Sequence, residues 1–398
     1  MRVLYLHPAG AFGGASKSLI ELYRQLSGHG VVGTVLTPAG SAQGAFAAAG
    51  LNVRVVRGLS QFDNTRFGFY RRLRWLILLR ELYLLPFSIV GLWRMRHEAF
   101  DLIHVNELTL LPLGLVAKRL WRVPMIVHVR SLQRPPGEGR RTRWLTDLLR
   151  RHADAVVAID HTVAATLADD LPLSVIHNGL SIDMGTSQAR PADEYEPVKV
   201  GFLGVLVELK GIFELLEAMH ILKQRGVNIR CLVAGENARQ LSRWKAWLLA
   251  KFGFGRDVRA ELEALIERHG LRQHVELLGF VADVRTLYPQ LDILCFPSHL
   301  NAAGRPVFEA AFYGIPSVVA VRDPVADAVI HEVTGLAIAE PQPPLIADAL
   351  QRLVEDPELR GRLGAQARVW AEQTFTIESN AACMAELYQA IVSKAARR

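Results

Sequence analysis

The chain has 398 residues, half of them hydrophobic, and a formal net charge of +7 at pH 7. Such a chain can form two α/β domains, each with its own core, which makes one compact domain the poorer interpretation. The excess of Lys and Arg favours anionic partners such as nucleotides, anionic lipid or nucleic acid. These basic residues are clustered, so their position matters more than their number.

The three cysteines lie far apart in apolar surroundings, at Cys231, Cys295 and Cys383. None belongs to a Cys-x-x-Cys or Cys/His spacing of the kind that binds zinc. We therefore expect reduced core residues and a cytoplasmic protein. The first apolar run, Val3–Leu6, is much shorter than the core of a signal peptide, so no export is expected.

Apolar runs typical of buried strands alternate with helical periodicity along the whole chain. This alternation predicts parallel, doubly wound sheets. The elements expected in the first half are Val3–Leu6, Ser18–Leu26, Gly33–Thr37, Ala42–Ala49, Val53–Val56, Leu102–Val105, Leu111–Leu120, Met125–Val129 and Ala155–Ile159. Those expected in the second half are Lys199–Phe202, Gly211–Gln224, Arg230–Ala234, Val258–His269, Val275–Leu278, Ile293–Phe296, Val307–Tyr313 and Ser317–Val321.

A polar, acidic segment from Gly179 to Pro197 has the composition of a linker between two domains. We place a first domain at 1–180, a linker at 181–197, a second domain at 198–376 and a final helix at 377–398.

The final helix has Met384, Leu387, Tyr388 and Ile391 on one face. This face predicts a helix that crosses back to the first domain.

Ligands of open α/β sheets bind outside the carboxyl ends of the strands. We therefore expect a site in the cleft between the two domains, where these segments converge: Pro8–Gly14, Leu203–Gly204, Ala234–Glu236 and Phe296–Ser298.

The most informative stretch is 296–316, because it contains a loop, a helix start and an acidic residue. Gly304, Arg305 and Pro306 precede an apolar run that carries Glu309, and proline is favoured at the start of a helix. Backbone N–H groups there can bind phosphate, and Arg305 adds a planar cation. The alternative is an ordinary loop and an acid that complements the helix dipole.

Motifs in a fixed order resemble the retaining, nucleotide-sugar-dependent glycosyltransferases of family 4, which have the two-domain GT-B fold. The resemblance covers nearly the whole chain. The motifs that carry it are Gly13–Ser16, Phe100–His104, Val175–Gly179, Lys210–Gly211, Ala234–Glu236, Leu277–Val281, Phe296–Ser298, Phe308–Ala310 and Thr334–Gly335.

The resemblance implies a donor site for a nucleotide-diphosphate sugar, most simply a UDP- or GDP-sugar, with no cofactor and no metal. Lys210 matches the lysine that neutralises the leaving diphosphate, and Glu309 matches the acid that binds the donor ribose. Candidate catalytic residues are Lys210, Glu309, Arg305 and His128. Candidate donor-binding residues are Gly13, Gly14, Gly204, Lys210, Gly235, Glu236, Asn301, Ala303, Gly304, Arg305, Pro306, Val307 and Glu309. The alternatives are a plain turn at the glycines and a solvated lysine.

Two positions depart from the family pattern. Asn301 stands where the first glutamate of the family's pair is usual, and Val205 where an arginine is usual. We interpret these changes as a subfamily with other donor contacts, in which Arg305 supplies the missing cation. The alternative is a protein that has lost its transfer chemistry.

Acceptor binding is expected at two strand ends in the first half. His128 and Arg130 end one strand, and similar enzymes have a histidine or arginine there that faces the reacting sugar. His104 and Asn106 end the preceding strand. His128 and Arg130 can alternatively be polar residues that face a loop, and His104 and Asn106 are the weaker candidates. His177 is expected to be structural.

Residues 66–96 combine seven arginines with one acid, Glu81, among large apolar residues. Pro86 breaks this run, so we expect an interfacial segment on an anionic membrane surface and no spanning helix. A pair of core helices with snorkelling arginines is the alternative. Residues 239–259 form a second basic and aromatic stretch.

The predicted function is sugar transfer to a glycan or polyprenyl-linked acceptor at the cytoplasmic face of the membrane, in cell-surface polysaccharide or glycolipid synthesis. The alternative from another class is a non-catalytic GT-B protein that binds nucleotide-sugars. An epimerase lacks motif support, and nucleic-acid binding lacks a recognisable module. A dehydrogenase is disfavoured because Gly10, Gly13 and Gly14 do not form G-x-G-x-x-G.

Overall fold

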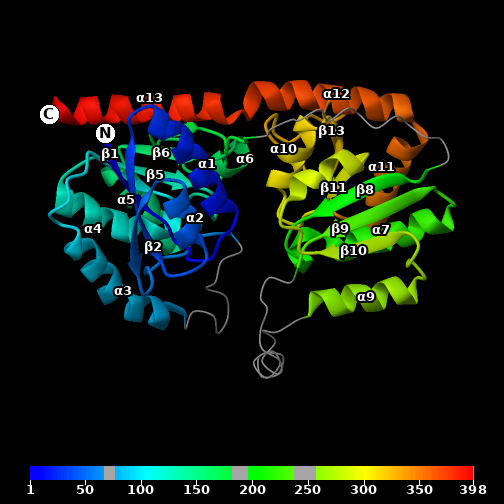
Figure 1. The fold of residues 1–398 in the computed structure, drawn as a ribbon, viewed down its shortest axis with the longest axis horizontal. Coiled ribbons are helices and arrows are strands. Elements are labelled where there is room, and N and C mark those ends of the chain that lie inside the picture. The colour runs from blue at the N-terminus through cyan, green and yellow to red at the C-terminus, as the bar shows by residue number, and fades with distance from the viewer. Residues whose placement is uncertain (67–76, 182–195, 237–256, 398) are drawn as a thin grey trace. The chain divides into compact units, whose positions relative to one another are not determined.

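The computed structural model describes residues 1–66, 77–181, 196–236 and 257–397 (Figure 1). The chain divides into two compact units. The first contains Met1–Ser181 together with Phe375–Arg398, and the second contains Ile182–Thr374. Most of the expected linker, and residues 239–256 of the second basic stretch, lie outside the described residues.

The described part of the first unit contains a seven-stranded parallel sheet in the order β3-β2-β1-β4-β5-β6-β7. Every residue of its central strands β4, β5 and β6 is buried, which explains why these strands are apolar except for His104 and His128. The strands are β1 (Arg2–Leu6), β2 (Val32–Pro38), β3 (Asn52–Val56), β4 (Leu102–Val105), β5 (Met125–Val129), β6 (Ala155–Ala158) and β7 (Leu173–Val175).

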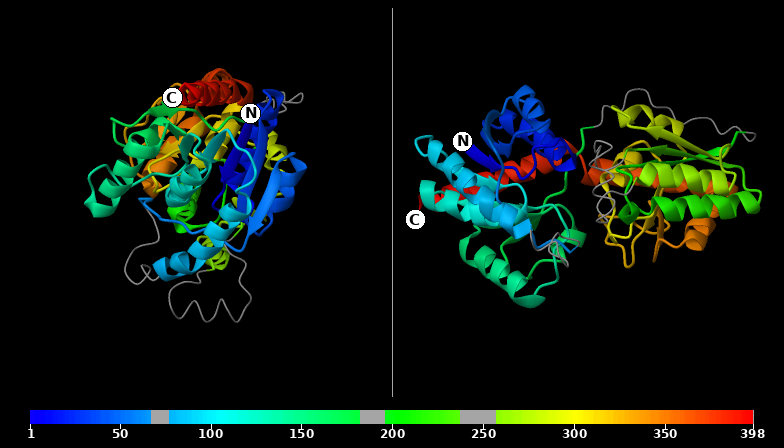
Figure 2. Two further views of the ribbon diagram at one scale, coloured as in Figure 1. Left: turned by 90° about the vertical axis from the view of Figure 1, so that its left-hand side faces the viewer. Right: turned by 90° about the horizontal axis from the view of Figure 1, so that it is seen from below.

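Helices cover both faces of this sheet (Figures 1 and 2). Alternate residues of β1 point to opposite faces, so Val3 and Tyr5 join one core while Leu4 and Leu6 join the other. The helices are α1 (Gly14–Gly28), α2 (Ala42–Ala48), α3 (Ile77–Arg94), α4 (Leu111–Trp121), α5 (Gly139–His152), α6 (His161–Ala164) and α13 (Ile377–Ala396).

The last helix, α13, belongs to the first unit, as the sequence predicted. It packs along α1, and Figure 1 shows it in red beside that helix. Met384, Tyr388 and Ile391 are buried in the core that contains Tyr5, and Leu387 packs against this core.

The described part of the second unit contains a six-stranded parallel sheet in the order β10-β9-β8-β11-β12-β13. Its strands are β8 (Val198–Leu203), β9 (Ile229–Ala234), β10 (Val275–Gly279), β11 (Ile293–Phe296), β12 (Ser317–Ala320) and β13 (Gly335–Ile338). Its helices are α7 (Ile212–Gln224), α9 (Val258–Arg268), α10 (Arg305–Phe312), α11 (Pro343–Glu355) and α12 (Pro357–Thr374), with a short 3-10 helix, η3 (Glu208–Lys210). Separate cores on the two faces again show layers of helices around a sheet.

Two parallel sheets covered by helices confirm the predicted fold class. Two expectations about single residues were wrong. Cys383 lies on the exposed side of α13, whereas Cys231 and Cys295 are buried. Helix α3 continues through Pro86, which lies on the exposed side of the helix, where water can hydrogen-bond the carbonyl group that proline leaves without a donor.

A backbone contact fixes the turn before α7. Gly211 has φ of +75°, and a Cβ atom there would lie 1.7 Å from the carbonyl oxygen of Pro297. Glycine therefore meets two demands at once, because it tolerates the left-handed conformation and leaves room for the loop after β11.

We predict that Gly211→Ala lowers the free energy of unfolding of the second unit by about 4 kcal/mol or more, because it adds a steric clash to a strained φ. Gly226→Ala is the matched control, since Gly226 has φ of +72° and open space beside it. The control is expected to cost about 1–2 kcal/mol. Denaturant titration of both variants checks this, and equal losses would contradict it.

Candidate functional site

The loops after β8 and β9 in the second unit approach each other through their backbones. A Cβ atom at Gly235 would lie 1.8 Å from the carbonyl oxygen of Gly204, which has φ of +150°. Gly204 N–H donates to Ala234 O at 3.0 Å, and Leu206 N–H donates to Glu236 O at 2.9 Å. Gly204, Gly235 and Glu236, all expected in the donor site, therefore lie together at one sheet edge.

Lys210 ends η3 and lies beside the loop after β11. The carbonyl of Leu209 accepts hydrogen bonds from His299 N–H at 3.0 Å and from Ser298 Oγ at 3.2 Å. The Lys210 Nζ atom lies 4.8 Å from the centre of the Phe296 ring. Burial lowers the pKa of Lys210. Within the described residues no carboxylate pairs with this lysine, which leaves its charge for an anionic ligand.

Glu309 is buried on α10 and is held from two sides. Arg305 Nε donates to its Oε1 at 2.8 Å, and the Tyr288 hydroxyl donates to its Oε2 at 2.7 Å. Burial, and then the charge of Glu309, raise the pKa of Tyr288 well above its usual value. Sequence reasoning missed Tyr288, because a 3-10 turn about twenty residues earlier carries no signal for this contact.

The start of α10 is shaped by close packing. Gly304 is the N-cap, and a Cβ atom there would lie 2.4 Å from the Phe296 ring. Pro306 follows Arg305 in the first turn, and Ala303 packs against the core below. Val307 differs from this set, because its side chain is buried in that core and its N–H donates to Gly304 O at 2.9 Å. Of the expected donor residues it is the least able to touch a ligand.

Asn301 has a left-handed backbone, with φ of +52°. Its Oδ1 accepts a hydrogen bond from Arg322 N–H at 2.7 Å. The amide oxygen thus braces the loop after β12, a contact that the sequence did not predict. Val205, where a cation is usual, is about half exposed and brings no charge.

The glycine turn of the first unit precedes α1. Gly13 is the N-cap of that helix and Gly14 its first residue. A Cβ atom at either position would meet nothing within 4 Å, whereas at Gly10 it would lie 2.3 Å from Ala39 O. The turn therefore needs Gly10 for packing, and the open space beside Gly13 and Gly14 is available to a ligand.

The polar residues at the ends of β1, β4 and β5 form one hydrogen-bonded group. Asn106 Nδ2 lies 2.8 Å from His7 Nδ1, and Arg130 Nε donates to Asn106 Oδ1 at 2.9 Å. Arg130 Nη2 and His104 Nε2 each lie 3.3 Å from His128 Nδ1. The four expected acceptor residues, His104, Asn106, His128 and Arg130, are thus brought together, and His7 joins them.

Burial lowers the pKa of each histidine in this group. The pKa of His7 and of His104 falls to about 3, because burial removes solvation and the Arg130 charge adds repulsion. The pKa of His128 is also well below its usual value, for the same reasons and because of His104. All three imidazoles are therefore neutral near pH 7.

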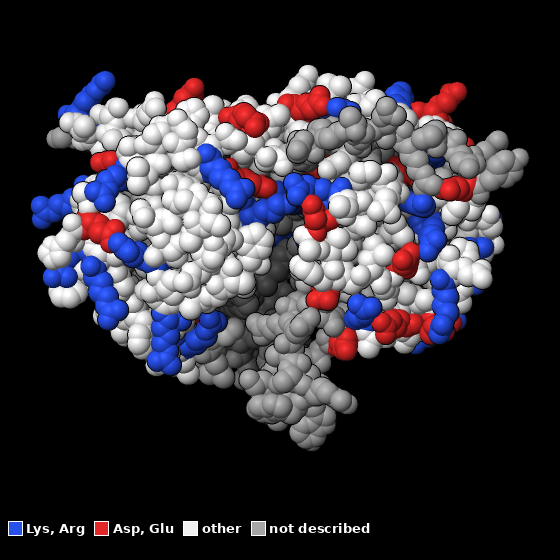
Figure 3. Space-filling model, viewed as in Figure 1, with Lys and Arg blue, Asp and Glu red and all other residues white. Residues whose placement is uncertain are grey.

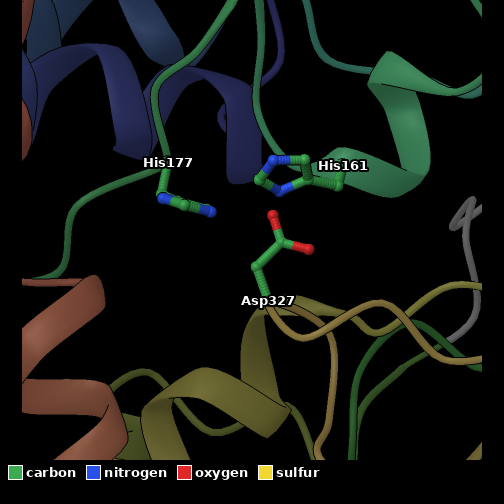
Figure 4. A group of neighbouring side chains, drawn as sticks. All are labelled: His161, His177 and Asp327. Atoms are coloured by element: carbon green, nitrogen blue, oxygen red, sulfur yellow. The ribbon is translucent and has the colours of Figure 1, made fainter.

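Two further histidines of the first unit, His161 and His177, are drawn in Figure 4, and their ring centres lie 6.4 Å apart. Asp327, in the same view, belongs to the second unit. The His177 ring packs edge-on against Phe375 at 5.0 Å, and the His177 backbone N–H donates to Asn380 Oδ1. These contacts agree with a structural role for His177. Two imidazoles are fewer than the three protein ligands of a catalytic zinc site.

Helix α3 exposes several large apolar side chains, although Leu84 and Leu92 on its inner side are buried. Its buried residues include Glu81 and Ser88, whereas Leu79, Leu82 and Trp93 are 61%, 65% and 55% exposed. The Glu81 carboxylate accepts a hydrogen bond from Gln61 N–H at 2.7 Å, which explains this inward acid. None of the described helices is both long and apolar enough to cross a membrane.

Arginines flank the exposed apolar face of α3. Arg57 lies over the rings of Tyr83 and Phe87, and Arg96 lies 3.6 Å from the centre of the Trp93 ring. Figure 3 shows basic side chains with uncharged surface between them over the part of the first unit where Figure 1 places α3.

Two family models match the chain. The model described as "Glycosyl transferase 4-like domain" matches residues 13–179, and "Glycosyl transferases group 1" matches residues 186–370. The chain belongs to the group 1 glycosyltransferases. This confirms the resemblance inferred from its motifs, and with it glycosyltransferase activity.

The curated relatives of this glycosyltransferase are distant from it in sequence. The glycogen synthase of Mycobacterium tuberculosis is 24% identical over 73% of this chain and 69% of its own. A D-inositol 3-phosphate glycosyltransferase of Corynebacterium glutamicum is 24% identical over 95% of this chain and 92% of its own.

Solved structures share the fold. HepE of Anabaena, in complex with UDP and glucose, is 22% identical with a TM-score of 0.74, over 98% of this chain and 100% of HepE. Sucrose-phosphate synthase of Thermosynechococcus elongatus is 18% identical with a TM-score of 0.72, over 99% of each chain. These similarities confirm the predicted GT-B fold.

We predict that the glycosyltransferase loses stability as the pH falls from 6.5 towards 3. His7 and His104 have a pKa of about 3 when folded, below the value of 6.5 in the unfolded chain. Below pH 6.5 the unfolded chain therefore binds protons that the folded chain does not, at a cost of about 1.4 kcal/mol per pH unit for each histidine. Above pH 6.5 this contribution is fully present. Denaturant titrations between pH 7.5 and 5 measure the slope.

The variant His7→Gln isolates one of these histidines, because its side chain stays neutral throughout. Its slope between pH 6 and 5 is expected to be shallower by about 1.4 kcal/mol per pH unit. His29→Gln, at an exposed position, is the control and should keep the original slope. A slope that His7→Gln leaves unchanged would show that His7 is already protonated in the folded protein.

Proposed function

We propose that the protein is a retaining, metal-independent glycosyltransferase that moves a sugar from a UDP- or GDP-sugar to a glycan or polyprenyl-linked saccharide. It acts at the cytoplasmic face of the membrane, in the synthesis of cell-surface polysaccharide or glycolipid. One observation carries the proposal: Lys210, which pairs with no described carboxylate, lies in a loop that is hydrogen-bonded to the segment leading into α10.

Lys210 and the start of α10 stabilise the leaving diphosphate in this proposal. A point charge suits a phosphate group, and backbone N–H groups at a helix start add partial positive charge. Charge that develops on the leaving group is then stabilised where it forms, which carries most of the catalysis. The sugar is attacked on the face that the diphosphate leaves, and a donor phosphate oxygen takes the acceptor proton.

Glu309 binds the ribose hydroxyls of the donor. Tyr288 and Arg305 hold the carboxylate in one orientation, so that less side-chain entropy is lost when the nucleotide binds. The complex of HepE with UDP and glucose favours UDP as the nucleotide.

Val205 and Asn301 support the competing function, a GT-B protein that binds a nucleotide-sugar without turning it over. Val205 removes a diphosphate ligand, and the Asn301 oxygen is bonded to the backbone of Arg322. We favour transfer, with Arg305 as the replacement cation, because Arg305 lies in the first turn of α10 beside the proposed phosphate position.

The acceptor side lies in the first unit. Gly13 and Gly14 leave open space for the reacting groups, and His128 supplies a polar contact to the sugar. The polar side-chain atoms of His104 and Asn106 are all hydrogen-bonded to neighbours, so these residues support the group, whereas His128 Nε2 has no partner among the described residues.

The exposed face of α3 is the membrane-binding surface in this proposal. Leucines, aromatic residues and flanking arginines together match the interface of an anionic bilayer, where apolar side chains enter the acyl region and the guanidinium groups meet phosphates. An enzyme with a lipid-linked acceptor has to bind the membrane, which would explain such a surface.

We predict that UDP raises the thermal midpoint of the wild-type protein and that Lys210→Ala abolishes this shift. The same variant is expected to lower turnover by about 100-fold or more, because it removes a charge that stabilises the leaving group. Differential scanning fluorimetry with UDP and GDP, and sugar release from the matching sugar nucleotides, measure the two effects.

Lys223→Ala is the matched control, since Lys223 lies on the same unit with its Nζ bonded to His269 O and Gly270 O. Its nucleotide response should equal that of the wild type. If nucleotide stabilises the wild-type protein but no sugar nucleotide is turned over, the non-catalytic function is the correct one.

We also predict that the protein sediments with phosphatidylglycerol vesicles and not with phosphatidylcholine vesicles. A double substitution, Leu79→Gln with Leu82→Gln, should weaken this binding at least about tenfold, because a buried leucine side chain contributes about 1.5–3 kcal/mol. Val369→Gln, at an exposed valine of α12, is the control. Equal sedimentation of all three proteins would exclude α3 as the membrane-binding surface.

A further inference from the structure

The Arg130 guanidinium donates hydrogen bonds in three directions. Nε donates to Asn106 Oδ1 at 2.9 Å, and Nη1 donates to Asn178 Oδ1 at 2.5 Å. Nη2 lies 3.3 Å from His128 Nδ1. Because a guanidinium has only donors, each of these partner atoms must be an acceptor. One arginine therefore sets where its neighbours carry their protons.

The hydrogen bond from Arg130 fixes the position of the proton on His128. Its Nδ1 accepts from Arg130, so the proton of the neutral ring is on Nε2. His104 Nε2 lies 3.3 Å from the same Nδ1 and must then be a donor as well. The other nitrogen of His104, Nδ1, is left as an acceptor for the Tyr388 hydroxyl, 2.5 Å away on α13. For neutral rings, this fixes the order of protons from Tyr388 to His128.

The position of the proton on His7 is fixed through the side-chain amide of Asn106. Since Asn106 Oδ1 faces Arg130, its NH2 group donates to His7 Nδ1 at 2.8 Å. The proton of His7 is therefore also on Nε2, from which it donates to Ser16 Oγ at 3.0 Å. Ser16 lies in the first turn of α1, two residues after Gly14.

Burial keeps this arrangement neutral. His7 and His104 are fully buried and His128 is 2% exposed. Their lowered pKa values follow from this burial and from the Arg130 charge. A second proton on His7 or His128 would place a donor against another donor, Asn106 Nδ2 or Arg130 Nη2.

We propose that Arg130 is a positioning residue, whose guanidinium fixes His7, His104 and His128 in the neutral form with the proton on Nε2, and that Tyr388 completes the arrangement. His128 Nε2–H has no hydrogen-bond partner among the described residues, and we assign it to an oxygen of the substrate sugar. This assignment of the donor rests on the proposed transferase function, whereas the proton arrangement does not. The hydrogen bond from Tyr388 to His104 also gives helix α13 a role in the first unit beyond packing.

Long-range ¹H–¹⁵N spectra of the imidazole rings test the arrangement directly. The full chain is labelled at histidine, and the signals are assigned with His7→Gln, His104→Gln and His128→Gln. All three rings are expected to be neutral at pH 7 with the proton on Nε2. A proton on Nδ1 of His128, or a charged ring among the three, would overturn the proposal.

The variant Arg130→Lys keeps the charge but cannot donate in three fixed directions. It is expected to give His128 a mixture of tautomers and to lower kcat about tenfold or more, with less than about a threefold change in KM for the donor. Spectra identical to the wild type would show that Arg130 does not fix the protons.

The variant Tyr388→Phe is a milder change that keeps the ring in the core. It should move the ¹⁵N resonance of His104 Nδ1, which loses its donor, and lower kcat a few-fold. Tyr23→Phe is the matched control, because the Tyr23 hydroxyl bonds to Gly50 O in the same core, away from His104. Unchanged His104 resonances in Tyr388→Phe would overturn the role of α13.

The two proposals fail in different ways. The expected tautomers in a protein that transfers no sugar would leave the proton arrangement standing and remove the transferase function. Sugar transfer by a protein whose His128 carries its proton on Nδ1 would leave the transferase function standing and overturn the proton arrangement.

Discussion

Parallel pairing of the strands is the constraint on which the rest of this structure depends. In a parallel sheet every carboxyl end lies at the same edge, so the residues that follow the strands are brought together whatever their distance in sequence. In the first unit this gathers His7, Asn106 and Arg130 after β1, β4 and β5. In the second it gathers Gly204, Gly235 and the loop after β11. Glycines complete the arrangement where two of these loops touch through their backbones, as Gly211 does against Pro297.

The two groups of polar residues meet the cost of burial in different ways. In the first unit the histidines lose their charge, and a single cation, Arg130, is held by amide and imidazole acceptors. In the second unit charge is retained, because Glu309 is paired with Arg305 on the same helix and accepts a hydrogen bond from Tyr288. Neutral donors suit contacts to sugar hydroxyls, whereas fixed charges suit a diphosphate. The electrostatics of each group thus agree with the ligand proposed for it.

Helix α3, at the surface of the first unit, also buries polar groups together with their hydrogen-bond partners. An acid and a serine occupy its buried side because the segment after β3 offers them backbone partners: Gln61 N–H for Glu81, and Ser60 N–H for Ser88. The outer side exposes Leu79, Leu82 and Trp93, whereas Leu84 and Leu92 are buried beside the acid and the serine. A surface helix usually has polar residues on its outer side. Such a helix gains stability from a second apolar phase, and the flanking arginines point to an anionic one.

Much of the architecture was determined by the sequence alone. The runs at Leu102–Val105 and Met125–Val129, apolar except for one histidine each, favoured strands buried on both faces. Ordered motifs such as Lys210–Gly211 and Phe308–Ala310 indicated the family. The C-terminal helix was predicted from one apolar face. Short elements such as β7 and β13 were missed, because three or four residues give little periodic signal. Helix α5 was also missed, although Thr142, Leu145 and Leu149 share its buried face.

Only the tertiary structure decided which side chains contact each other. Tyr388 is 284 residues from His104, and Tyr288 is 21 residues from Glu309, so neither hydrogen bond leaves a trace in local sequence. Arg130 was predicted at the acceptor and Asn301 at the donor sugar; the hydrogen bonds that they make within the fold, to Asn106 and to Arg322, were not predicted. Sequence patterns report the burial and periodicity of single elements, but hydrogen bonds between side chains depend on distances that exist only once those elements have packed.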